Sequence, residues 1–134
     1  MKLSKGIKIN MGSRVILSLM NIVLLLVVLT PLFATFFSMM YMPDVVILHY
    51  GPSGPDDFGA KTELFVAAGI MSFSMFICWL CFVFCERITA LQPWKNQSEK
   101  SIFMTRIILA GSIILLAVLY VVILLLIYLD SSAL

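Results

Sequence analysis

Residues 107–129 read IILAGSIILLAVLYVVILLLIYL and contain no charged side chain. Two further charge-free apolar runs precede this one, from Val15 to Tyr41 and from Leu64 to Cys85. Each run exceeds the roughly 20 consecutive apolar residues that a helix needs to cross the hydrocarbon core of a bilayer. The sequence therefore predicts three transmembrane helices, at residues 15–41, 64–85 and 107–129.

The composition is typical of a chain whose main solvent is lipid. Of the 134 residues, 62% are hydrophobic and 12% are charged, whereas a soluble domain is about half apolar and about a quarter charged. The apolar runs lack the period-two alternation of a membrane β-barrel, so we predict an all-α membrane protein. A cleaved signal peptide is the alternative for the first run, but that run is much longer than the roughly 7 to 15 apolar residues of such a peptide. We expect the first helix to remain as an anchor.

The basic residues are distributed unevenly between the two sides of the predicted spans. Of the 9 Lys and Arg residues, Lys61 alone lies in residues 42–63, and the others lie in residues 1–14 and 86–106. By the positive-inside rule, the 1–14 tail and the 86–106 loop are cytoplasmic, whereas the 42–63 loop and the 130–134 tail are external. Topology and attraction to lipid headgroups account for the basic tail, and no nucleic-acid-binding fold is left to assign. We predict a multi-pass membrane protein with a cytoplasmic N-terminus and an external C-terminus.

Several positions within the spans depart from plain hydrocarbon. Pro31 cannot donate a hydrogen bond to the carbonyl of Val27, which predicts a kink in the first helix. Ala68 and Ser72 are four residues apart and form a strip of small side chains along which another helix can approach closely. A similar strip in the third span consists of Ala110, Gly111 and Ser112. These strips predict packing seams, either within a three-helix bundle or between copies of it in a homo-oligomer.

Three cysteines share one face of the second span. Cys78, Cys81 and Cys85 are spaced by three and four residues, a spacing that places them on one side of a helix near its cytoplasmic end. Three thiols of this kind are ligands for a soft metal ion. We favour the alternative that they pack as small apolar side chains, because the cytoplasm is reducing and no fourth ligand is evident. We therefore predict neither a metal nor a disulfide here.

The segment between the first two spans carries most of the polar information. Residues 42–61 read MPDVVILHYGPSGPDDFGAK. The stretch from Val45 to Tyr50 is β-prone and contains His49, the 1 histidine of the chain, whereas residues 51–59 are dense in glycine, proline and aspartate. This pattern predicts a compact, turn-rich loop.

The charged residues of this loop are expected to lie close together. The turns bring His49 and Asp44 toward Asp56 and Asp57, and one of these two aspartates is expected to cap the next helix or to pair with Lys61.

The same segment resembles a known family at specific positions. The chain resembles the small bacterial domain of unknown function at the N-terminus of SdpI-type immunity proteins. In both, two membrane helices are joined by a loop of one pattern: Pro-Asp, a short apolar stretch, His-aromatic, a Gly-containing turn, Asp-x-aromatic-Gly and a lysine. The matching positions are Pro43, Asp44, His49, Tyr50, Gly54, Asp57, Phe58, Gly59 and Lys61. The resemblance implies a bacterial cell membrane, a role in immunity, and an external loop that these residues make into a binding site. Proteins of that type continue into a multi-helix domain, whereas a single predicted helix follows here.

The residues favour binding over chemistry. His49 and Ser53 share the loop, but no third orienting group is required by their spacing, so we predict that the chain is not an enzyme. A zinc-type site of His49 with Asp44, Asp56 or Asp57 is chemically reasonable, but with neither a cysteine nor a second histidine in the loop we predict no metal and no cofactor.

Four carboxylates against one lysine give residues 42–63 a net charge of −3. This charge is complementary to a cationic peptide or to the surface of a membrane-protein partner. We therefore predict that the loop binds such a ligand. The alternative is an accessory subunit of a larger membrane transporter or sensor complex, which the small-residue strips favour.

Overall fold

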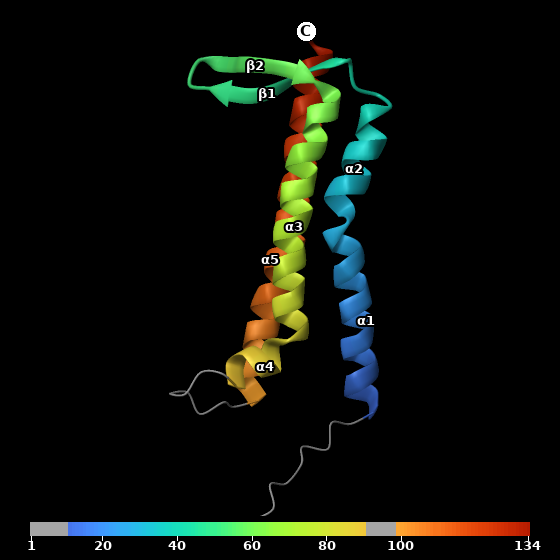
Figure 1. The fold of residues 1–134 in the computed structure, drawn as a ribbon, viewed down its shortest axis with the longest axis vertical. Coiled ribbons are helices and arrows are strands. Elements are labelled where there is room, and N and C mark those ends of the chain that lie inside the picture. The colour runs from blue at the N-terminus through green and yellow to red at the C-terminus, as the bar shows by residue number, and fades with distance from the viewer. Residues whose placement is uncertain (1–10, 91–98) are drawn as a thin grey trace, which may run out of the picture.

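The structure, a computed structural model, describes residues 11–90 and 99–134. Three helical segments are long and apolar enough to cross a membrane, namely Met11–Met39, Lys61–Val83 and Lys100–Ser132. They run alternately up and down as one elongated bundle (Figure 1). The prediction of three such helices is confirmed. The third helix, α5 (Glu99–Ser132), begins about two turns before the apolar run that predicted it.

The first crossing consists of two helices, α1 (Met11–Val28) and α2 (Thr30–Met39), separated at Leu29. The break lies next to Pro31, which has no N–H to offer to the carbonyl of Val27. The predicted kink is therefore present as an interruption of the helix. Both helices still follow one continuous path along the bundle (Figure 1).

Each crossing packs through one face, on which buried positions recur at intervals of three or four residues. On α3 (Leu64–Val83) the central buried positions are Ala68, Ser72 and Met75. The complete set is Leu24, Val28, Pro31 and Thr35 in the first crossing, Leu64, Ala68, Ser72, Met75 and Phe82 in α3, and Ile113, Ala117, Tyr120, Leu124, Ile127 and Ser131 in α5. This spacing is that of a coiled-coil seam. The remaining faces of the helices are largely exposed and apolar, as helices surrounded by lipid require.

The two predicted small-residue strips differ in whether they pack within the bundle. Ala68 is fully buried and Ser72 is 7% exposed, so this strip is a seam within the bundle. Gly111 is exposed, and a Cβ atom built on it would meet no heavy atom within 4 Å. Gly111 therefore takes no part in a seam within this chain, whereas its neighbour Ala110 is partly buried against the core of the bundle.

Two polar contacts also join the crossings. The hydroxyls of Thr35 and Tyr120 form a buried hydrogen bond of 2.6 Å between α2 and α5. The indole N–H of Trp79 on α3 donates to the backbone carbonyl of Asn21 on α1 at 3.1 Å. Polar atoms within an apolar bundle are costly unless they are bonded, so these contacts fix the rotation of the helices.

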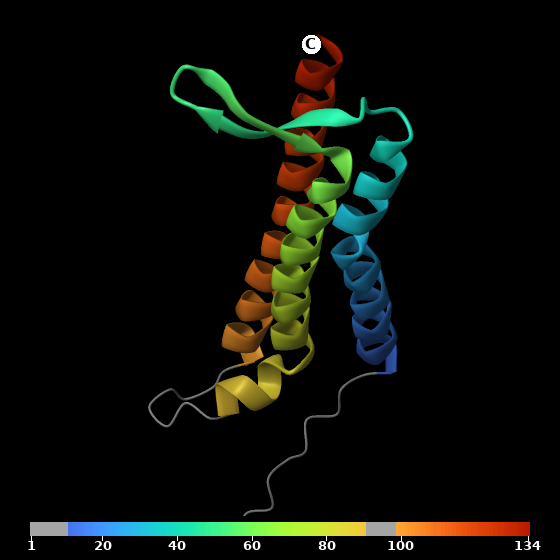
Figure 2. The same cartoon turned by 45° about the horizontal axis from the view of Figure 1, so that its top comes forward.

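The segment between the first two crossings forms a β-hairpin, so the all-α prediction holds for the crossings only. Strand β1 (Val45–Gly51) pairs antiparallel with β2 (Gly54–Ala60), and the register is irregular on both sides of the pair His49 and Asp57. A short 3-10 turn, η1 (Lys61–Glu63), then leads into α3. The hairpin lies across one end of the bundle, and its turn extends sideways past the helices in both views (Figures 1 and 2).

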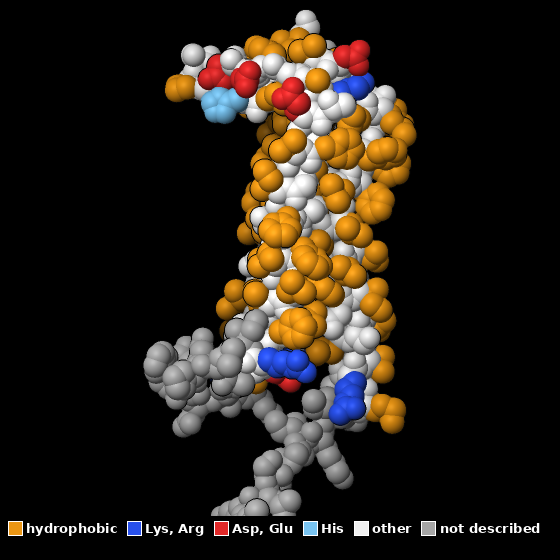
Figure 3. Space-filling view, in the orientation of Figure 1, with side chains coloured by type: hydrophobic (Ala, Val, Ile, Leu, Met, Phe, Trp, Pro, Cys, Tyr) orange, Lys and Arg blue, Asp and Glu red, His pale blue; other side chains and the backbone are white. Residues whose placement is uncertain are grey.

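The two ends of the molecule differ in charge. We call them the hairpin end, which also holds the end of α5, and the opposite end. Acidic side chains gather along the hairpin, whereas lysine and arginine lie mainly at the opposite end (Figure 3). The described basic residues at the opposite end are Arg14, Arg87, Lys100 and Arg106. The predicted contributions of Lys2, Lys5, Lys8 and Lys95 lie outside the described residues.

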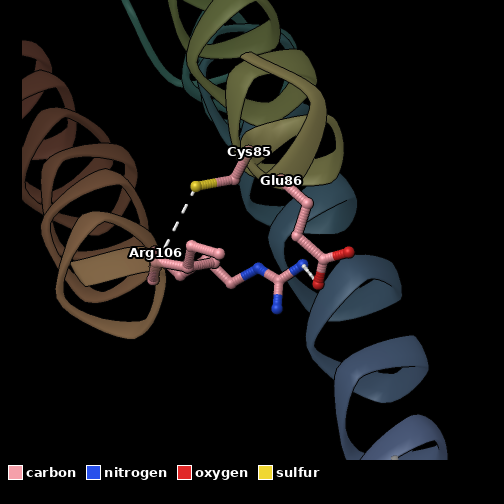
Figure 4. A network of polar contacts seen from close by, with 4 residues as sticks. Cys85, Glu86 and Arg106 are labelled. Atoms are coloured by element: carbon pink, nitrogen blue, oxygen red, sulfur yellow. Dashed lines mark hydrogen bonds and ion pairs between the residues drawn. The ribbon is translucent and has the colours of Figure 1, made fainter. Parts of the chain in front are cut away.

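At the opposite end, a short helix α4 (Cys85–Ala90) is tied to α5 by two contacts (Figure 4). Arg106 donates to the carboxylate of Glu86 at 3.1 Å, and the Cys85 thiol lies 3.9 Å from the carbonyl oxygen of Ile102. Cys85 is buried, and Cys78 and Cys81 are partly buried. Within the described residues these thiols form no disulfide, and Cys78 packs against the apolar core of the bundle.

Candidate functional site

The base of the hairpin is closed by Asp44 and Lys61. The Lys61 ammonium lies 2.9 Å from a carboxylate oxygen of Asp44, and the Lys61 backbone N–H donates to the Asp44 carbonyl at 3.1 Å. The same ammonium donates to the carbonyl of Met42 at 3.4 Å. The hydrogen bond from Lys61, and then its charge, lower the pKa of Asp44. The expectation that Lys61 pairs with Asp56 or Asp57 is wrong, because the strands place these aspartates nearer the turn.

One side of the hairpin is attached to the last turn of α5. The N–H of Ile47 donates to the Ser131 hydroxyl at 3.2 Å, and the Tyr50 hydroxyl donates to the Asp130 carboxylate at 2.8 Å. Val46 and Ile47 are fully buried or nearly so. Partial burial, and then the hydrogen bond to Asp130, raise the pKa of Tyr50. The hairpin is therefore fixed to a helix that is 80 residues later in the sequence.

His49 and Asp56 form a pair nearer the turn. Nδ1 of His49 lies 2.6 Å from a carboxylate oxygen of Asp56, and both side chains are largely exposed. The carboxylate of Asp56 occupies the space that a Cβ atom on Gly51 would need, so a larger residue here would displace that carboxylate. Gly54 has φ of +121°, a conformation that other residues rarely adopt. The two glycines thus permit the tight turn and the pair beside it.

The imidazole of His49 responds to its acidic neighbours. The hydrogen bond to Asp56, then the charge of Asp56, and last the charge of Asp57 raise the pKa of His49 above its ordinary value of 6.5. Because the pKa of His49 is higher in the folded hairpin, its protonation stabilises the fold, and this contribution is complete at pH values below 6.5. The contribution is lost as the pH rises through the raised pKa.

We predict that the Asp56→Asn variant returns the pKa of His49 toward 6.5 and removes this pH dependence. The measurement is an NMR titration of the His49 imidazole in the wild type and in the variant. Asp57→Asn serves as the matched control, and it should lower the pKa by a smaller amount because Asp57 acts through its charge alone. A wild-type His49 that titrates at or below its ordinary value would contradict the pair.

The residues that carry the resemblance to SdpI-type proteins fall into two groups in the structure. Four of them hold the hairpin: Asp44 and Lys61 at its base, Tyr50 on α5, and Gly54 at the turn. Gly59 belongs with these, because a Cβ atom there would collide with the side chain of Leu48. The remaining positions are exposed, namely Pro43, His49, Asp57 and Phe58. The matching pattern is thus largely explained by the construction of the hairpin.

The sequence predicted that His49 and Asp44 would both approach Asp56 and Asp57, and this is only partly so. His49 meets Asp56, whereas Asp44 lies at the base of the hairpin with Lys61. Sequence reasoning missed Asp130 and Ser131, for which no signal existed, and it did not single out Asp56 as the partner of His49. Among the described residues, no group of 3 or more His, Cys, Asp or Glu side chains is placed to hold a metal ion.

Known proteins give no further indication of what this hairpin does. No family model matches the chain, and no curated protein or solved structure matches it significantly.

Proposed function

We propose that this chain is a multi-pass protein of a bacterial plasma membrane, with the hairpin outside and the N-terminus in the cytoplasm. Two observations support this orientation. Three helices are long and apolar enough to cross a membrane, and basic residues concentrate at the end away from the hairpin. The positive-inside rule assigns that basic end to the cytoplasm.

Reporter fusions test the orientation. A reporter placed after Leu134 is expected to be active on the outer side, and one placed at Asn96 is expected to be active in the cytoplasm. The reason is the excess of lysine and arginine around the 86–106 segment. A reporter after Leu134 that is active in the cytoplasm would contradict this topology, because three crossings from a cytoplasmic N-terminus place the C-terminus outside.

We propose further that the hairpin binds a cationic peptide, as the resemblance to SdpI-type immunity proteins implies. The observation that carries this proposal is the contrast between the two halves of the hairpin. Its base and one side are fixed by Lys61 and by the end of α5, whereas Asp57 and Phe58 on β2 are exposed and the turn extends past the bundle (Figure 2). A rigid, exposed element costs little entropy when it binds a ligand.

Asp57 is the carboxylate best placed to attract a cation. Asp44 is paired with Lys61, Asp56 is paired with His49, and Glu63 accepts a hydrogen bond from the Ala60 N–H at 3.3 Å. The carboxylate of Asp57 makes no hydrogen bond or ion pair within the described part of the chain. When His49 is protonated, two cations stand against four carboxylates, and the net charge of residues 42–63 changes from −3 to −2. Immunity would then consist of intercepting a cationic toxin at the membrane surface.

Expression in a bacterium sensitive to the cognate cationic peptide tests this proposal. Asp57→Asn is expected to lower the tolerated peptide concentration about tenfold, since it removes the attracting charge. Asp57→Glu should retain tolerance, and Ser53→Ala at the exposed turn is the control for a change in the hairpin without a change in charge. The same loss is expected when His49 and Asp57 are both replaced by alanine. Full tolerance in that double variant, at equal abundance in the membrane, would exclude recognition through the hairpin.

A second candidate function is that of an accessory subunit in a larger membrane complex. The observation in its favour is an apolar groove of about 510 Å³ between α2 and α5, lined by Ala34, Phe37, Ser38, Tyr41, Val121, Leu124, Leu125 and Tyr128. We propose a helix of a partner protein as its occupant. Photo-crosslinking from position 125 in cells distinguishes the two functions, because a protein partner gives a discrete crosslinked band whereas lipid does not.

A further inference from the structure

The hairpin is a two-stranded sheet, and its two outer edges have different surroundings. The outer edge of β1 is occupied, because Ile47 donates its N–H to Ser131 and β1 packs against α5. Strand β2 packs substantially against β1 alone among the described elements. The outer edge of β2 is therefore open.

The register identifies which backbone groups point out of that edge. Ile47 pairs with Phe58, and the N–H of Ile47 points away from β2 toward Ser131. In an antiparallel pair both residues direct their N–H and C=O the same way, either toward each other or outward. The N–H and C=O of Phe58 thus point outward from β2. Ala60, two residues later, agrees with this alternation because its N–H donates outward to Glu63.

The open stretch is short and bounded at both ends. Pro55 has no N–H, which prevents pairing near the turn. At the other end, the N–H of Ala60 already has Glu63 as its acceptor. Between these limits Phe58 offers one donor and one acceptor, beside the exposed carboxylate of Asp57.

We propose that a short extended segment of a cationic peptide adds to the edge of β2, exchanging two backbone hydrogen bonds with Phe58. This inference rests on the proposed peptide-binding function and specifies its geometry. Successive side chains of a strand point to opposite faces, so Asp57 and Phe58 lie on different faces of the sheet. The matching peptide therefore alternates basic residues, which face Asp57, with apolar residues, which face Phe58. Backbone pairing supplies affinity, and the alternating side chains supply specificity.

Two variants at one position separate backbone pairing from side-chain contact. Phe58→Ala removes the ring and keeps the N–H, whereas Phe58→Pro removes both. Proline is tolerated at an edge position whose N–H faces outward, so the ladder between β1 and β2 should persist. The probe is a synthetic peptide of alternating lysine and valine, with binding measured to the protein in nanodiscs of zwitterionic phosphatidylcholine. A copy of the peptide methylated at its backbone nitrogens tests the same bonds without any change in the protein.

The expected result is that Phe58→Pro weakens binding at least about tenfold relative to Phe58→Ala, and that the methylated peptide binds wild type equally poorly. Equal affinities for the methylated and unmethylated peptides would overturn strand addition. If that equal binding still depends on Asp57, the proposed peptide-binding function survives the failure. If neither peptide binds wild type more tightly than a peptide of alternating glutamate and valine, both proposals fail.

Discussion

Replacing Ala68 by leucine is expected to destabilise the bundle by about 1–3 kcal/mol, the usual cost of inserting methyl groups into a filled core. Ala68 is fully buried and belongs to the cluster that joins α3 to Tyr120 and Leu124 of α5 and to Val46 of the hairpin. Packing drives the association of helices in lipid, so a bulkier side chain at this contact is felt directly. The measurement is thermal unfolding of the detergent-solubilised protein, followed by tryptophan fluorescence.

Gly111→Leu is the matched control. Gly111 is exposed on α5, with open space where a side chain would project. Its replacement should leave the unfolding temperature unchanged, even though the sequence presents both positions as small residues within a span. Equal destabilisation by the two variants would contradict the arrangement of the bundle. Loss of a co-purifying protein in Gly111→Leu alone would favour the accessory-subunit function.

The second large effect is expected from Ser131→Ala. The Ser131 hydroxyl accepts the N–H of Ile47, a residue that is 1% exposed. Removing the acceptor leaves a buried backbone donor unpaired, at a cost of about 1–3 kcal/mol. The amide of Ile47 should then exchange with solvent hydrogen about 5 to 150 times faster, if the cost appears in local opening.

The neighbouring residue supplies a close control for this experiment. The Ser132 hydroxyl is exposed and donates to the Tyr128 carbonyl at 2.6 Å within its own helix. Ser132→Ala therefore removes a hydroxyl of the same size, one position away, without touching the hairpin. The amide exchange rate of Ile47 should stay at its wild-type value in that variant. Equal acceleration by both variants would mean that the end of α5 frays as a whole.

The crossings could be predicted because lipid imposes a simple requirement on sequence. A helix surrounded by hydrocarbon must be long, apolar and free of charge, and residues 107–129 satisfy this without any knowledge of tertiary contacts. The interruption at Leu29 also followed from local chemistry, because Pro31 lacks a donor. On α3 the small residues Ala68 and Ser72 marked the buried face. The buried faces of the other crossings remained hidden, since apolar side chains cover all their faces alike.

The hairpin could be predicted only in part. Residues 45–50 are β-prone, and β1 forms there, whereas residues 54–60 of β2 contain glycine, proline and aspartate that disfavour strands. Pairing with β1, together with closure of the base by Asp44 and Lys61, overrides that local preference. The partner of His49 depended on the irregular register around it, which selects Asp56 over Asp57. No local pattern encodes such an irregularity.

The attachment of the hairpin to α5 has a consequence for the order of assembly during synthesis. The hairpin leaves the ribosome 80 residues before Asp130, the acceptor for Tyr50. At about 5–20 residues per second, the ribosome needs roughly 4 to 16 s to make that stretch. During this interval the first two crossings can insert, but Ile47 and Tyr50 lack the groups that hold them. The nascent hairpin therefore lacks its docking contacts until the end of the last crossing has been made.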